Sequence, residues 1–115
     1  MDQQLLDKIE AYRAKGFEVP DEDMIKTPEQ IEGIRKACEI NTKVLDEVAK
    51  HIKAGMTTAD IDKIVYEFTT AQGAVPAPLG FCGFPKSVCT SINDQVCHGI
   101  PSENDVLKSG DIVNV

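Results

Sequence analysis

The residue best suited to chemistry in this 115-residue sequence is His98, which lies between Cys97 and the run Gly99-Ile100-Pro101. An imidazole titrates near neutral pH, so His98 can donate a hydrogen bond to a reacting amide or carbonyl group. The glycine that follows it lets another group approach the backbone closely. Local sequence alone leaves a functional and a structural role for this histidine both open.

Two aromatic rings and a thiol precede this histidine in the chain. Phe81 and Phe84 lie three residues apart in the run Phe81-Cys82-Gly83-Phe84-Pro85. Such a loop can wall an apolar pocket for a small side chain, and ordinary core filling is the alternative. Cys89 follows on a predicted strand. A nucleophilic cysteine needs a base, and no residue next to Cys89 supplies one, so a thiol protease that pairs it with His98 is disfavoured.

Other familiar motifs are missing from the sequence. The four cysteines form no C-x-x-C pair and the chain has two histidines, so a zinc finger is poorly supported. We expect reduced thiols, three of them packed as small hydrophobic groups. His51 is predicted in the last turn of a helix, where it interacts favourably with the helix dipole. A metal-binding role with Glu47 is the less favoured alternative.

Charge and length restrict the function further. The chain carries 19 acidic and 12 basic residues, a net charge of −7. Phosphate contacts would meet a repulsive average field, so we expect no nucleic acid and no anionic membrane as partner. Lys86 and Lys108 are isolated and are expected at the surface. One soluble globular domain fits this length, and because the start lacks the apolar stretch of a signal peptide, we expect a cytoplasmic protein.

Three helices are predicted in the first two thirds of the chain. Residues 2–16 show a short amphipathic pattern that stops at a glycine, and residues 17–26 are a connector. A capping box at Thr27–Gln30 begins a long helix that reaches Gly55, and a second cap at Thr57–Asp60 begins another that reaches Gly73. The predicted buried stripes are Ile31, Ile34, Cys38, Leu45, Val48 and Ile52 on the long helix, and Ile61, Ile64, Val65 and Phe68 on the next.

The last third predicts strands and turns, which makes the fold class α+β. Asn93-Asp94 is expected to join the strands 87–92 and 95–97 as a hairpin. A further strand covers Ile112–Val115, where the sequence ends on an apolar run. Natural domains seldom end inside an apolar strand, because its unpaired edge invites association. We therefore expect this chain to be a fragment of a longer protein.

Three runs in order resemble type I methionine aminopeptidase: Gly83–Asn93, Val96–Pro101 and Leu107–Val115. The helix start at Thr27–Ile31 and the break at Gly55–Thr58 are also similar to that family. The resemblance covers residues 27–115 and leaves residues 1–26 as an N-terminal extension with a short helix. It implies the N-terminal lobe of the pita-bread fold, with two helices packed on a curved antiparallel sheet.

In that family a pair of divalent metal ions (cobalt, manganese, iron, zinc or nickel) activates the hydroxide that attacks the peptide carbonyl. The resemblance therefore implies a metallo-exopeptidase that removes the initiator methionine of nascent polypeptides, with the ribosome as a further partner. The family's first metal-binding aspartate follows the residues that match Ile112–Val115. We expect this chain to bind no metal, to be inactive alone and to self-associate.

The resemblance carries over the substrate side of the site. His98 matches the histidine that hydrogen-bonds the substrate near the scissile amide. Phe81, Phe84 and Cys89 match positions that line the pocket for the methionine side chain. The family often has tyrosine at the two phenylalanine positions, so the pocket of this chain is expected to be more apolar.

Two alternatives stay beside this hypothesis. The first is a naturally short, non-catalytic relative that binds peptide N-termini, or a protein partner through the strand edge at Ile112–Val115. The second is another pita-bread enzyme, such as a proline-specific peptidase. The runs Phe-Pro-Lys-Ser-Val-Cys and Cys-His-Gly-Ile-Pro favour the methionine enzyme over this second alternative.

Overall fold

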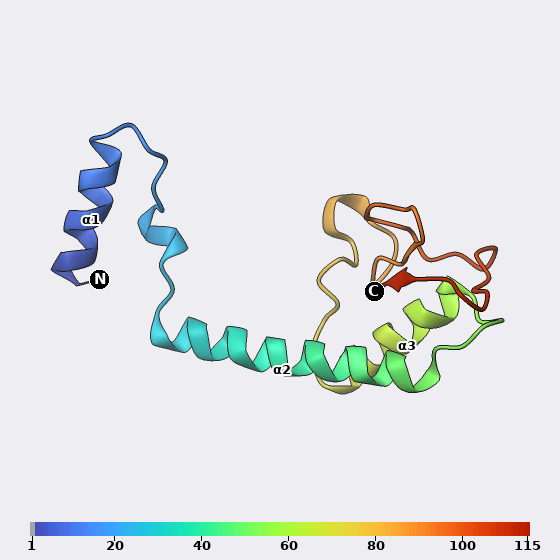
Figure 1. Ribbon diagram of the computed structural model, residues 1–115. Coiled ribbons are helices and arrows are strands. Elements are labelled where there is room, and N and C mark those ends of the chain that lie inside the picture. Colours follow the sequence, from blue (N-terminus) through green and yellow to red (C-terminus); the bar gives the residue numbers. More distant parts are fainter. Residues whose placement is uncertain (1) are drawn as a thin grey trace. The chain divides into compact units, whose positions relative to one another are not determined.

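The computed structural model describes residues 2–115, which divide into two compact units, one up to residue 35 and one from residue 36 onward. Three α-helices occupy the first part of the chain, and loops with two short strands occupy the last third (Figure 1). None of the helices formed by residues 2–115 combines the length and apolar character that a bilayer crossing needs. The predicted boundary between residues 26 and 27 stays a prediction.

The first helix, α1 (Gln3–Arg13), confirms the predicted N-terminal helix in a shorter form. Asp2 caps it, because its Oδ1 accepts the backbone N–H of Leu5 at 2.7 Å. The chain then turns at Gly16, whose φ of 82° suits a residue without a Cβ. The predicted connector 17–26 contains one 3-10 turn, η1 (Glu22–Met24).

The long helix, α2 (Pro28–His51), begins at the predicted capping box. Thr27 Oγ1 accepts the N–H of Gln30 at 3.3 Å, and Gln30 Oε1 accepts the N–H of Thr27 at 2.9 Å. These two bonds satisfy backbone donors that a helix start leaves unpaired. The helix ends four residues before Gly55, whose N–H instead donates to the Leu107 carbonyl at 2.8 Å.

The predicted buried stripe of α2 is wrong for most of its length. Of its six residues only Val48 is buried, and Leu45 and Ile34 are 44% and 50% exposed. The buried pair is Val44 and Val48, one helical turn apart. Leu45 lies about 100° further around the helix, so it points away from the face that Val44 and Val48 define.

The third helix, α3 (Thr58–Ala71), supplies the other half of the core. Its predicted cap forms as a full capping box between Thr57 and Asp60. Its predicted apolar face is confirmed, with Ile61 fully buried and Val65 nearly so. The buried core cluster consists of Val44, Val48, Ile61, Val65 and Leu107.

The sheet consists of two short antiparallel strands, β1 (Ser91–Ile92) and β2 (Val113–Asn114). The predicted hairpin with residues 95–97 is wrong, since β1 pairs with β2 and residues 95–97 are not a strand. The Gln95 side chain accepts the N–H of Ile92 at 2.9 Å. That side chain occupies the donor that a hairpin ladder would use.

Candidate functional site

The turn that carries His98 is fixed against the segment that carries Cys89. Thr90 donates its N–H to the Gly99 carbonyl at 2.8 Å, and Gly99 donates its N–H to Ser91 Oγ at 3.2 Å. A Cβ on Gly99 would lie 2.0 Å from the Thr90 carbonyl oxygen, closer than any side chain permits. The predicted close approach at this glycine is therefore confirmed.

His98 itself adopts a backbone conformation that non-glycine residues rarely take. Its φ is 57°, and its residue surface is exposed. Left-handed backbone costs energy for a residue with a Cβ, so the surrounding contacts must hold it. Here the hydrogen bonds of the next residue, Gly99, do so. The imidazole is thus presented to solvent from a backbone that neighbouring bonds restrain.

The aromatic loop closes on itself. Phe81 begins the short 3-10 turn η2 (Phe81–Gly83), and Gly80 donates its N–H to the Phe84 carbonyl at 2.9 Å. Phe84 returns a bond from its N–H to the Phe81 carbonyl, also at 2.9 Å. Phe81 is 72% exposed and Phe84 is half-buried, as is Cys89. The two rings therefore differ in their surroundings, and their roles in a pocket stay predictions.

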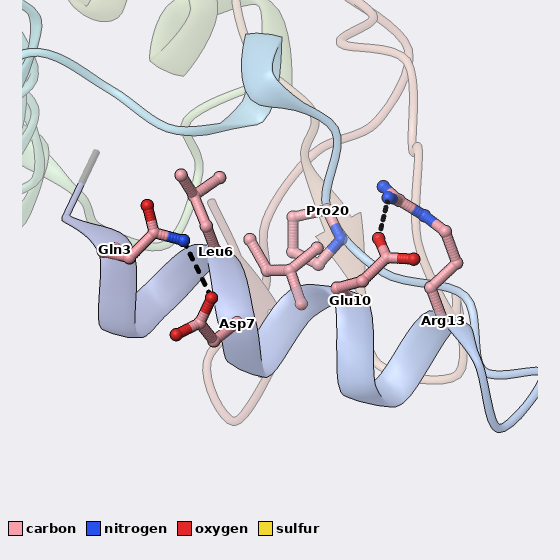
Figure 2. Close-up of a pocket in the computed structure, with 7 residues that line it drawn as sticks. Gln3, Leu6, Asp7, Glu10, Arg13 and Pro20 are labelled. Carbon is pink, nitrogen blue, oxygen red and sulfur yellow. Dashed lines mark hydrogen bonds and ion pairs between the residues drawn. The ribbon is translucent and has the colours of Figure 1, made fainter.

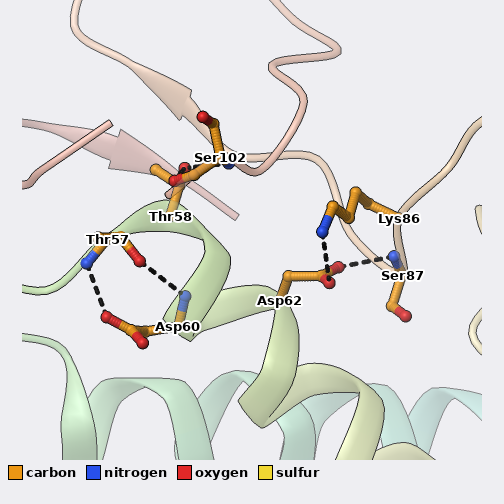
Figure 3. Close-up of polar contacts among 7 residues, drawn as sticks. All are labelled: Thr57, Thr58, Asp60, Asp62, Lys86, Ser87 and Ser102. Atoms are coloured by element: carbon orange, nitrogen blue, oxygen red, sulfur yellow. Dashed lines mark hydrogen bonds and ion pairs between the residues drawn. The ribbon is translucent and has the colours of Figure 1, made fainter. Parts of the chain in front are cut away.

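Helix α3 contacts the segment between Phe84 and Cys89 and the segment that follows His98 (Figure 3). Asp62 Oδ1 accepts the N–H of Ser87 at 2.7 Å, and Asp62 Oδ2 lies 4.0 Å from Lys86 Nζ. Thr58 Oγ1 accepts the N–H of Ser102 at 2.8 Å and donates to the Ser102 carbonyl at 3.1 Å. Neither contact is predictable from local sequence, because the partners lie 25 and 44 residues apart.

A second set of polar contacts fixes the end of β1. Asn93 Nδ2 donates to Asp111 Oδ1 at 2.9 Å, and Asn93 Oδ1 accepts the N–H of Ile112 at 3.0 Å. The Asn93 hydrogen bond and the backbone N–H of Lys108 hold the pKa of the Asp111 carboxyl below its usual value. The side chain of Asn93, at the predicted turn, thus links the end of β1 to the residues that lead into β2.

The second histidine has the predicted capping role. His51 Nδ1 donates to the Glu47 carbonyl oxygen at 2.9 Å and lies 3.6 Å from Glu47 Oε1. Within residues 2–115 no three side chains of the metal-binding types (His, Cys, Asp or Glu) gather into a group that fits a metal ion. The described residues therefore do not fit a two-metal centre.

The four cysteines are free thiols, but Cys38, Cys82 and Cys97 are exposed, so the expectation that three of them pack as hydrophobic groups is wrong.

A hollow of about 280 Å³ lies along α1 and Pro20 (Figure 2). It contains none of the four predicted site residues.

The sequence pattern of metallopeptidase family M24 matches residues 32–115. Methionine aminopeptidase 1A of Arabidopsis thaliana is 53% identical over 91 residues, 79% of this chain and 23% of that protein. The methionine aminopeptidase of Chlamydia trachomatis is 43% identical over 113 residues, 96% of this chain and 37% of that protein. This second similarity extends into residues 1–26.

Two solved structures that are similar to this chain are also methionine aminopeptidases. A crystal structure of methionine aminopeptidase from Rickettsia prowazekii has a TM-score of 0.74 at 44% identity, over 77% of this chain and 36% of that chain. The enzyme from Thermotoga maritima gives 0.75 at 39% identity, with the same two coverages. The predicted fold class, a lobe of the pita-bread fold, is confirmed. The chain spans 23% and 37% of the length of the two curated relatives above.

Proposed function

This chain belongs to metallopeptidase family M24, and we propose that the complete protein removes the N-terminal methionine of nascent polypeptides. The observation that carries the proposal is the sequence identity between this chain and methionine aminopeptidases, which is 53% for the Arabidopsis enzyme. The proposal includes the cytoplasm as the compartment and the ribosome as a further partner, since nascent chains emerge there.

Residues 2–115 supply the substrate side of the site in this proposal. His98 donates a hydrogen bond near the scissile amide, supported by its exposure and its restrained turn. Phe84 and Cys89 line the methionine side-chain pocket, supported by their half-buried positions, and Phe81 closes its outer edge. An apolar pocket suits the methionine side chain, which carries no hydrogen-bond donor.

The catalytic metal ions belong to another part of the complete protein. We propose two divalent ions, drawn from cobalt, manganese, iron, zinc and nickel. The residues described do not form a group that fits them, so no step of the hydrolysis is assigned to a metal on this chain. The proposed role of residues 2–115 is to bind and orient the substrate.

Substrate choice tests the proposal. The complete gene product should release free methionine from a peptide that begins Met-Ala and should leave a peptide that begins Ala-Pro intact. Replacing His98 with alanine should lower kcat/KM about a hundredfold or more, the usual cost of losing one hydrogen bond to the reacting group. His51→Ala is the matched control and should keep wild-type activity, since His51 caps a helix.

Two outcomes would overturn the proposal. Preferential cleavage after the first residue of the Ala-Pro peptide would assign a proline-specific peptidase. A complete gene product that binds Met-Ala peptides without cleaving them would favour the non-catalytic alternative.

A further inference from the structure

We propose that Asp62 is a positioning residue that sets the selectivity of the methionine side-chain pocket, an inference that rests on the proposed function. Asp62 lies on α3, and its side chain is 14% exposed. It does not belong to the four residues predicted for the site. Its carboxylate acts through the loop that carries two of them.

The contact that matters is a hydrogen bond to a buried backbone amide. Ser87 is 4% exposed, and its N–H donates to Asp62 Oδ1 at 2.7 Å (Figure 3). A buried N–H without a partner is costly, and a bond to a carboxylate is stronger than a neutral one. A single side chain on α3 thus determines where Ser87 lies.

Ser87 lies between the two half-buried residues of the predicted pocket. It follows Phe84 by three residues and precedes Cys89 by two. Backbone geometry limits how far such short segments can shift independently. A displacement of Ser87 therefore moves both Phe84 and Cys89. The positions of Phe84 and Cys89 relative to the rest of the site decide which side chain fits, so the Asp62 bond controls selectivity.

The ion pair with Lys86 contributes less. Asp62 Oδ2 lies 4.0 Å from Lys86 Nζ, and the lysine side chain is 37% exposed. Solvent-exposed ion pairs contribute little, because water and salt screen them. The loop position should therefore depend on the Asp62 carboxylate as an acceptor and only weakly on the charge of Lys86.

The other side of the predicted site has its own anchor on the same helix. Thr58, which is fully buried, exchanges two hydrogen bonds with Ser102. Ser102 follows the turn that contains His98 by four residues. Loss of the Asp62 carboxylate should therefore displace the pocket loop while Thr58 keeps the His98 side in place.

The test uses four variants of the complete gene product. Asp62→Ala removes the acceptor, and Asp62→Asn keeps an acceptor oxygen without the charge. Lys86→Met removes only the ion pair. Glu67→Gln is the matched control, because it neutralises an exposed carboxylate on the same helix. For each variant, KM and kcat are measured with peptides that begin with methionine, norleucine or leucine, together with hydrogen exchange at the Ser87 amide.

Asp62→Ala should raise KM for the methionine peptide about tenfold or more, change kcat less, and reduce the preference for methionine over leucine by a similar factor. Exchange at the Ser87 amide should accelerate in the same variant. Asp62→Asn should recover most of both properties, and the Lys86 and Glu67 variants should stay near wild type.

Unchanged Ser87 exchange in Asp62→Ala would overturn the proposal, as would unchanged selectivity in a variant that still cleaves methionine. Equal losses of kcat for all three substrates would also contradict it, since they would indicate general misfolding. If the wild-type protein releases no methionine, the proposed function fails and selectivity with it, whereas the Ser87 exchange still decides whether Asp62 holds the loop.

Discussion

At the scale of single residues, the His98 turn and the pocket loop are each held by a close contact, at Gly99 and at Asp62. The sequence predicts a close approach at the glycine after His98, because glycine is the residue type that such contacts require. The partner that makes the approach, the Thr90 carbonyl, lies nine residues earlier and was not predictable from the pattern. The bond between Asp62 and Ser87 is not predictable either, because its partners lie 25 residues apart and a carboxylate on a helix is usually exposed to solvent.

Gly99 gives the sharpest prediction at this scale. In Gly99→Ala the new Cβ meets the Thr90 carbonyl oxygen, which is backbone and cannot move aside cheaply. We expect the free energy of unfolding to fall by about 3 kcal/mol, the upper end of the cost of overpacking. Urea denaturation measures this change.

Gly33→Ala is the matched control, because nothing lies within 4 Å of its Cβ position and Gly33 is inside α2. It should raise stability by about 0.5–1 kcal/mol, since alanine favours helix more than glycine does. Equal effects of the two substitutions would contradict the steric explanation.

Asp111 predicts a dependence of stability on pH. Hydrogen bonds from Asn93 and the Lys108 backbone lower its pKa in the folded state below the ordinary 3.8. A group with a lowered folded-state pKa stabilises the fold fully above its unfolded-state pKa, and this contribution is lost as the pH falls through the folded-state value. Stability should therefore decrease below about pH 4.

Asp111→Asn should flatten this acid-side decrease, as measured by urea midpoints between neutral and acidic pH. The neighbouring Asp94→Asn leaves both hydrogen bonds of Asp111 in place and serves as control. An unchanged acid-side slope in Asp111→Asn would show that other carboxylates cause it.

At the scale of elements, the helix starts were predictable and the sheet was not. Both capping boxes, at Thr27 and at Thr57, are set by residues three positions apart, so the sequence contains the whole signal. The pairing of β1 with β2 depends on Asn93 and Asp111, which lie 18 residues apart. Local turn chemistry at Asn93 favours a hairpin, but the hydrogen bond from Asn93 to the distant Asp111 holds the end of β1 beside β2 instead.

The capping box of α3 predicts a measurable stability. Thr57→Ala removes the hydroxyl that accepts the N–H of Asp60 at 3.1 Å. We expect a loss of about 1 kcal/mol in the free energy of unfolding, the usual cost of an N-cap replaced by alanine. The same substitution at Thr70, whose hydroxyl bonds to carbonyls in the last turns of α3, should change stability little. Similar losses at both positions would argue against a specific capping contribution.

At the scale of the whole molecule, large apolar side chains are exposed in the second unit. Val96 is 94% exposed, Ile112 is 77% exposed and Phe81 is 72% exposed. Exposed apolar surface of this kind favours association, particularly beside a short strand with a free edge. We therefore predict that the isolated 115-residue chain self-associates.

Sedimentation at several concentrations measures this association. Ile112→Lys adds a charge beside β2 without removing a core residue, and it should shift the chain toward the monomer. A wild-type chain that remains monomeric and unfolds cooperatively over the same concentrations would contradict the prediction.

We propose that residues 2–115 form the substrate side of a larger metallopeptidase whose metal ligands lie elsewhere in the same protein. The intact mass of the native gene product from its source cells tests this claim most directly. We predict a mass well above 12.6 kDa, because the chain spans only 23% and 37% of the curated relatives compared above. A native product of 12.6 kDa would contradict it, and binding of peptide N-termini would then replace catalysis as the function to test.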